Sequence, residues 1–216
     1  MQTTKWFFAV VMVLALITPG ELLAQKWSSD DDIPVVTVKK RYFLKTKRSE
    51  IGANAGFLFG DTFVNTIGFS GLYAYHLSEM FFLEATGGFY LNYNSDSTKQ
   101  LINDFGITPD TDDVKYYAEA HIGWTPIYGK LNFLGKKIVY FDASLYGGGG
   151  ITDAKVSGLS PHVVVGLAQR FVFTKWMALR LDVKDSVVIR DSAGTAGTLR
   201  NMVGVYVGLS FFLPVK

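Results

Sequence analysis

Residues 201–213 read NMVGVYVGLSFFL, and the stretch alternates large apolar residues with small or polar ones along its whole length. A period of two places one set of side chains on each face of an extended chain, so the stretch predicts a β-strand. Its larger face carries Asn201, Val203, Val205, Val207, Leu209, Phe211 and Leu213, and its other face carries Met202, Gly204, Tyr206, Gly208, Ser210 and Phe212.

Seven further segments upstream share this kind of pattern. We expect the eight strands at about residues 50–59, 66–77, 80–93, 113–124, 138–147, 162–173, 177–189 and 201–213. A tilted transmembrane β-strand needs about 9–11 residues, and bacterial single-chain barrels have even strand numbers from about 8 upward. The sequence therefore predicts an all-β fold, an eight-stranded antiparallel transmembrane β-barrel of the smallest size class.

The second face of each strand distinguishes a membrane barrel from a soluble exported one. A soluble barrel needs a charged outer face, whereas residues 202–213 carry no charge and their second face is largely Gly, Ser and Tyr, which suits a narrow lumen. Amphipathic aromatic rings near strand ends predict a girdle at the headgroup level. The expected girdle residues are Tyr73, Tyr75, Tyr93, Tyr116, Trp124 and Trp176.

The connections predict which side of the membrane each end faces. We expect longer loops after the first, third, fifth and seventh strands, including a solvated, mobile loop at 94–112 and a third loop near 191–198. The connector 125–137 is the longest on the opposite side. Short turns in the periplasm and long loops outside are typical of the outer membrane, so both termini are expected to be periplasmic.

The amino terminus and the composition fit export to a Gram-negative cell envelope. An apolar run from Trp6 to Ile17 follows Lys5, which predicts a signal peptide at 1–24, then a periplasmic arm at 25–48, the barrel at 49–213 and a tail at 214–216. The chain has no cysteine, so it has neither a disulfide nor a lipid-modified cysteine. Its net charge of +2 does not indicate a nucleic-acid partner. The basic cluster between Lys39 and Arg48 either docks on a periplasmic partner or faces solvent, and we favour solvent.

Ionisable residues recur at the positions that we expect to face inward. In a narrow lumen such charges are costly unless they are paired, which predicts a salt-bridge network that plugs the barrel. A gated polar path, giving a narrow ion or small-solute channel, is the alternative. The expected lumen network comprises Glu84, Glu119, His121, Asp142, Arg170, Arg180, Asp182 and Lys184.

Other chemistry is weakly indicated. His76, His121 and His162 lie on different strands without close metal-ligand spacing, so we expect no metal and no cofactor, and structural or solvent-exposed histidines. Ser160 lies beside His162 without an evident acid; a lipid-modifying enzyme remains an alternative to a non-enzymatic barrel. The run 147–150 lacks the lysine and the helix of a phosphate-binding loop, so we expect a flexible strand end there. The aspartates of 110–113 indicate a solvated loop, with weak cation binding as the alternative.

Several short motifs resemble those of the small outer-membrane β-barrel domain proteins of myxobacteria and related predatory or gliding bacteria. They are the basic stretch before the first strand, Tyr75–Glu79, Trp124–Lys130, Phe141-Asp142 with the glycine run, and Arg180-Leu181-Asp182. The resemblance covers about residues 35–213 and implies a barrel without established enzymatic activity, in some members part of an envelope complex for surface motility. The partners that we expect are outer-membrane lipid, the barrel-assembly machinery and a periplasmic or envelope protein. Many outer-membrane proteins end on an aromatic residue that the machinery reads, whereas residues 213–216 follow Phe212 here, so the machinery would read Phe211 or Phe212.

Overall fold

The computed structural model describes residues 43–109, 111–133, 137–192 and 195–214. The expected signal peptide, residues 25–42 of the expected arm and residues 215–216 of the tail lie outside these ranges. The described elements are β1 (Ser49–Phe59), β2 (Val64–His76), β3 (Phe81–Asn94), α2 (Asp96–Phe105), β4 (Val114–Phe133), β5 (Lys137–Ala154), β6 (Gly158–Val172), β7 (Met177–Ser192) and β8 (Thr195–Leu213).

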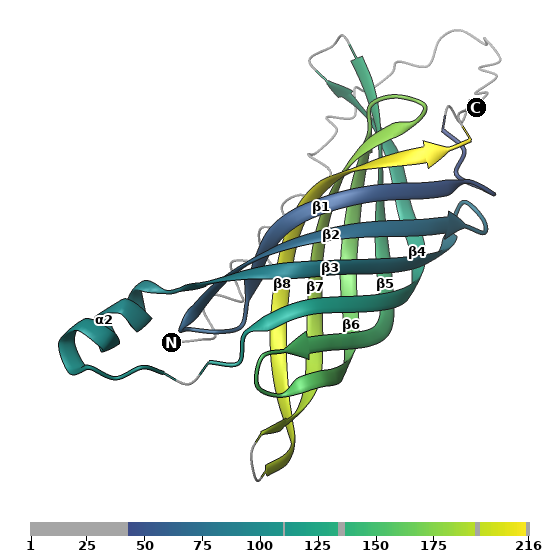
Figure 1. Cartoon of the computed structure of the whole chain (residues 1–216). Helices are drawn as coiled ribbons and strands as arrows, with labels where there is room; N and C mark the ends of the chain where they lie inside the picture. The colour runs from purple at the N-terminus through teal and green to yellow at the C-terminus, as the bar shows by residue number, and fades with distance from the viewer. Residues whose placement is uncertain (1–42, 110, 134–136, 193–194, 215–216) are drawn as a thin grey trace, which may run out of the picture. The chain divides into compact units, whose positions relative to one another are not determined.

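The eight strands close into one antiparallel barrel, in which each strand pairs with its sequence neighbours and β8 pairs with β1 (Figure 1). Ser49 of β1 lies opposite Tyr75 of β2 on one side and opposite Leu213 of β8 on the other. The predicted eight-stranded antiparallel barrel is confirmed. Closure leaves no free edge along the paired region of the sheet, so the strands satisfy one another's backbone groups.

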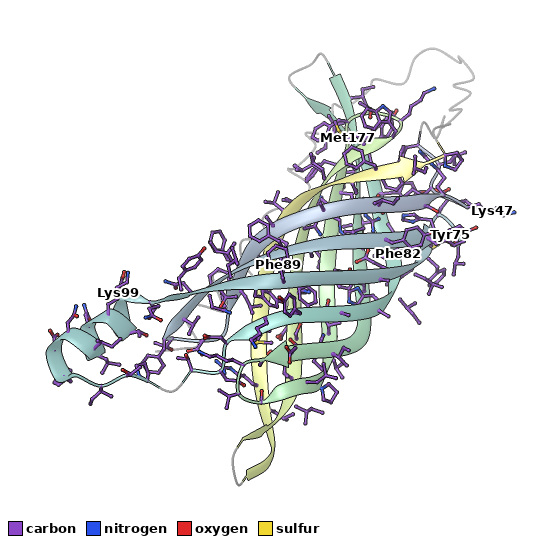
Figure 2. The ribbon with its side chains drawn as sticks, in the orientation of Figure 1. Lys47, Tyr75, Phe82, Phe89, Lys99 and Met177 are labelled. Atoms are coloured by element: carbon purple, nitrogen blue, oxygen red, sulfur yellow. The ribbon has the colours of Figure 1, made fainter. Side chains whose placement is uncertain are left out.

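The outer face of the barrel is an apolar belt. In β8 the odd-numbered side chains of 203–213 face outward and the even-numbered ones inward, as the alternation predicted. Figure 2 shows the side chains, including Phe89, that project from the outer face of the strands. Asp185 interrupts the outward row of β7 between Val183 and Val187. The six expected girdle aromatics Tyr73, Tyr75, Tyr93, Tyr116, Trp124 and Trp176 are all exposed.

The connector expected at 125–137 is instead mostly strand, so that prediction is wrong. β4 continues to Phe133 and pairs with β5 from Lys137 onward, as a hairpin that extends past the ends of the neighbouring strands. Pro126 suggested a break because proline cannot donate a ladder hydrogen bond. A register shift between Trp124 and Ile127 accommodates it, which is the role that a β-bulge serves.

The glycine run 147–150 lies in the interior of β5, not at a flexible strand end. Each of its residues is paired with β4 on one side and with β6 on the other. The long loop expected after the fifth strand is reduced to residues 155–157, because β5 continues to Ala154 and β6 begins at Gly158. The expected loop at 191–198 is shorter for the same reason, since β7 ends at Ser192 and β8 begins at Thr195.

The solvated loop expected at 94–112 contains the helix α2. The Ser95 side chain caps its first turn by accepting a hydrogen bond from the Thr98 amide at 3.4 Å. Gly106, at φ 65°, ends it with its amide bonded to the Ile102 carbonyl at 3.1 Å. The Asp, Asn, Ser and Thr content that indicated a loop is also the composition of helix caps. Among the described residues no helix is long and apolar enough to cross a membrane.

Candidate functional site

The barrel interior holds a dense set of buried ionisable side chains. Alternation along β3 to β7 aims them inward, so that successive charges on one strand are two residues apart, as in Arg180, Asp182 and Lys184 of β7. The structure places all eight residues of the expected lumen network at no more than 6% exposure: Glu84, Glu119, His121, Asp142, Arg170, Arg180, Asp182 and Lys184.

Arg180 is the most densely paired cation of this network. Its Nη1 and Nη2 donate to the two carboxylate oxygens of Glu84 at 2.6 and 2.9 Å, across the lumen from β7 to β3. Its Nε donates to Asp182 at 2.7 Å, and Nη1 lies 3.7 Å from Glu50. This bidentate geometry uses the planar fork of the guanidinium, which lysine lacks.

Arg170 links the network to the end of the barrel where β1 begins. Its Nη1 donates to Asp142 at 3.1 Å, its Nε lies 3.5 Å from Glu50, and its guanidinium lies 4.8 Å from the ring centre of Phe82. Lys45, which precedes β1, donates to the other Asp142 oxygen at 3.0 Å. Asp142 thus pairs with two cations, one of which it shares with Glu50.

Glu119 organises the other half of the lumen. Lys184 donates to both of its oxygens at 3.0 and 2.8 Å, and Nε2 of His162 lies 3.1 Å from Oε1. His121 lies between two carboxylates, with Nε2 3.2 Å from Glu119 and Nδ1 3.4 Å from Glu84. His121 therefore joins the Glu119 cluster to the Arg180 cluster in one continuous polar column.

An aromatic layer covers this column on the side away from Lys45 and Asp142. The ammonium group of Lys184 lies 4.1 Å from the ring centre of Tyr117 and 5.2 Å from that of Tyr206. Tyr90 stacks on Tyr117 at 5.0 Å and its hydroxyl lies 3.3 Å from that of Tyr206. The rings fill the lumen above the charges and supply cation–π contacts to Lys184.

Sequence reasoning missed four members of the network. Glu50, His76, His162 and Lys45 are all buried, and His76 lies 2.9 Å from Glu50. Glu50 shares a face with Gly52 and Asn54, and His76 shares one with Leu72 and Ala74, so the period-two pattern contained the signal. With these residues and Arg48, the described interior holds five carboxylates (Glu50, Glu84, Glu119, Asp142, Asp182) and five cations (Lys45, Arg48, Arg170, Arg180, Lys184).

Residues 43–48 close the end of the lumen beside β1, and we name them the entry strap. Part of the basic cluster that we expected in solvent is therefore buried, with Arg48 at 2% exposure. Arg48 donates to the carbonyls of Lys175 and Phe212, at 2.9 and 3.1 Å, and the Phe43 ring meets the Phe212 ring edge-on at 4.8 Å. The charge of these residues alone indicated exposure to solvent. The contacts that Arg48 makes with the barrel explain why it is buried instead.

Hydrogen bonds anchor the entry strap to the turn between β2 and β3. One Glu79 oxygen accepts from the Thr46 hydroxyl at 2.6 Å and from the amides of Thr46 and Lys45 at 2.9 and 3.0 Å. Burial raises the pKa of Glu79, but these donors more than offset it and hold the pKa below its usual value. Burial lowers the pKa of Lys45, and the nearby Asp142 carboxylate opposes that shift.

The filled lumen leaves little free space. The cavity bordered by Glu84, Glu119, Arg180 and Lys184 has a volume of about 10 Å³. A cavity needs roughly 10–15 Å³ by this measure to hold one water molecule. This cavity therefore has room for about one water molecule.

The remaining chemical candidates lie within this packed interior. Ser160 and His162 are both 4% exposed, and His162 lies against Glu119. The histidines that we expected as structural or solvent-exposed are all buried in the described lumen. Within the described ranges, no group of three or more His, Cys, Asp or Glu residues is arranged to hold a metal ion.

The fold and the interior define the class of this protein as a closed eight-stranded β-barrel with a charged, filled lumen. No protein-family model matches the chain, and no curated protein matches it. Similar solved structures include the outer-membrane protein OprG from Pseudomonas aeruginosa, at 12% identity and TM-score 0.45 over 79% of this chain and 97% of that one. The N-terminal barrel domain of Pseudomonas aeruginosa OprF (13%, TM-score 0.43, 78% and 98%) and a de novo designed transmembrane β-barrel (14%, 0.40, 78% and 98%) are similar to the same extent. At these identities the likeness concerns the fold alone.

Proposed function

We propose that the protein is a non-enzymatic barrel of the Gram-negative outer membrane, with its termini in the periplasm, whose closed lumen makes it a structural or interaction component of the envelope. The observation that carries the membrane assignment is the apolar outer belt with exposed aromatic residues at the strand ends. Water would not stabilise such a surface, whereas lipid would. Asp185 is compatible with this, because a carboxylate on a lipid-facing strand costs less than Arg or Lys.

The closed lumen supports the interaction role over the channel. An eight-stranded barrel encloses a space just wide enough for side chains. Here the space is occupied by paired charges, and the entry strap covers one end through Phe43, Lys45 and Arg48. A solute would have to displace several buried ion pairs at once.

The lipid-modifying enzyme is disfavoured by the direction of its candidate side chains. Such an enzyme must present its nucleophile and base to lipid. Ser160 and His162 instead face the lumen, and the carboxylate beside His162 is already paired with Lys184.

A charge inserted in the belt tests the membrane assignment. We expect Val207→Arg to lower the free energy of unfolding in phosphatidylcholine vesicles by about 2–4 kcal/mol, because Val207 is 49% exposed midway along the outward row of β8. Guanidinium titration of the refolded protein, followed by tryptophan fluorescence, measures the change.

Asn65→Arg is the matched control, because Asn65 faces outward at the loop end of β2. There the same charge reaches the interface, and we expect a loss of about 0–1 kcal/mol. Equal, small effects at Val207 and Asn65 would contradict a membrane-embedded belt, since exposed surface changes on a soluble barrel usually stay within about 0.5 kcal/mol.

The resemblance to the small barrels of myxobacteria and related gliding or predatory bacteria supports a proposed place in an envelope complex, such as one for surface motility. Its proposed partners are lipid, a periplasmic or envelope protein, and the assembly machinery during insertion. For the last of these, Phe211 is the available aromatic residue, because it faces outward at 38% exposure while Phe212 is fully buried.

A further inference from the structure

The helix α2 carries an apolar stripe that is only partly covered. Its apolar and small residues Thr98, Leu101, Ile102 and Phe105 follow the i, i+3, i+4, i+7 spacing of one helix face. Thr98 is buried and donates to the Phe63 carbonyl at 2.6 Å, so the stripe begins against the loop between β1 and β2. Farther along, Ile102 is 37% and Phe105 71% exposed.

The position of α2 relates this stripe to the apolar belt. Ser95, the cap of the helix, follows β3 directly, and the last outward aromatic of β3 is Tyr93, which is 53% exposed. Tyr116, 62% exposed, is the first outward aromatic of β4 on the returning side. Figure 1 shows α2 beyond the ends of the strands, and Lys99 marks it in Figure 2. The helix thus leaves the barrel at the limit of the belt that Tyr93 and Tyr116 mark.

The other face of the helix is polar and carries little net charge. Asp96, Lys99 and Asp104 lie on it, and Lys99 donates to Asp96 at 3.1 Å. A basic polar face would indicate electrostatic attraction to anionic headgroups, and this helix lacks one. Apolar contact is therefore the attraction that the described residues offer, and it continues the outward row that ends at Tyr93.

We propose that α2 lies in the outer-leaflet interface, with Ile102 and Phe105 in the boundary between headgroups and acyl chains. This inference rests on the proposed outer-membrane location and adds a lipid-contacting element to it. The Ser95 and Thr98 hydrogen bonds to Thr62 and Phe63 fix the start of the helix at the barrel. By contacting lipid beside the barrel, the helix then sets how deeply this loop end of the barrel lies in the membrane interface.

The absence of cysteine from the chain allows a direct test. Single nitroxide labels are introduced through Phe105→Cys, Ile102→Cys, Asp104→Cys and Leu91→Cys in protein refolded into dimyristoylphosphatidylcholine vesicles. Collision with oxygen, which partitions into lipid, is compared with collision with a water-soluble nickel chelate. Phe105, Ile102 and Asp104 are exposed and lie outside the barrel strands, and a heat-modifiability gel confirms folding of each variant.

The expected result is a depth of about 5–10 Å below the headgroup surface for labels at 105 and 102, with the label at 104 in water. Labels at 105 and 102 in water, with the label at 91 in lipid, would overturn the helix inference and leave the outer-membrane proposal intact. A label at 91 in water would overturn both. Spin–spin broadening that disappears on dilution with unlabelled protein would show contact with a second copy and would also overturn the lipid assignment. Labels at 105 and 102 that neither reagent reaches would overturn it too.

Discussion

Replacing Arg180 with alanine is expected to lower the free energy of unfolding by about 3–5 kcal/mol, the cost of removing one partner from a buried ion pair. Arg180 donates to Glu84 and Asp182 and lies 3.7 Å from Glu50, so its loss leaves Glu84 and Asp182 without their main cation. The side chain is only 1% exposed, so bulk water cannot replace it. Chemical denaturation in vesicles measures the change.

Arg200→Ala is the matched control for this prediction. Arg200 pairs with Asp61 at the loop end, where the two side chains are 30% and 20% exposed, so solvent screens the pair. The expected loss there is about 0–1 kcal/mol. Adding Glu84→Gln to Arg180→Ala should recover part of the lost stability, because it removes one uncompensated carboxylate. Equal losses for Arg180→Ala and Arg200→Ala would contradict the network.

Gly148→Ala is expected to prevent most of the protein from reaching the folded barrel. A Cβ at this position would lie 1.9 Å from the Ala120 carbonyl oxygen and 2.9 Å from the His121 Cα, both backbone atoms of β4. Overpacking a core usually costs about 1–3 kcal/mol when side chains can adjust. Here two paired strands must separate, so the cost exceeds that range. Heat-modifiability gels of the refolded variant measure the folded fraction.

The neighbouring Gly147→Ala controls for the intrinsic effect of alanine in β5. A Cβ there would meet nothing closer than the Val164 carbonyl oxygen at 3.7 Å, an ordinary contact. We expect this variant to fold like the parent protein. If both alanine variants fold equally well, the close approach of β4 and β5 at the glycine run is wrong.

The period-two pattern predicts much of this barrel, because each inward or outward assignment repeats along a strand. It predicts the number of strands, the outward rows and the strand faces that carry Glu84, Arg180 and Lys184. It fails where two signals compete. Pro126 and the glycine run indicate a connector and a strand end, yet β4 and β5 continue through them, because pairing with neighbouring strands outweighs local propensity.

The sequence could not predict contacts made outside the strands. Lys45 and Arg48 look like part of a solvated basic cluster, and only the closed barrel shows that they reach Asp142 and the Phe212 carbonyl. The helix α2 was not predicted, because the polar residues that form its cap also indicated a loop. Its signal was the Ser95–Thr98 capping pair followed by Leu101, Ile102 and Phe105 at helical spacing.

The central claim is that charged side chains close the lumen, and single-channel recording tests it most directly. Protein lacking residues 1–24 is refolded, shown to be folded by its heat-modifiable mobility, and added to a planar lipid bilayer. We predict no conductance above that of the bare bilayer, because the lumen is filled by the charged column from Lys45 to Glu119 and by the tyrosine layer next to Lys184. Stable, discrete conductance steps from the folded protein would contradict the closed lumen and would establish the channel in its place.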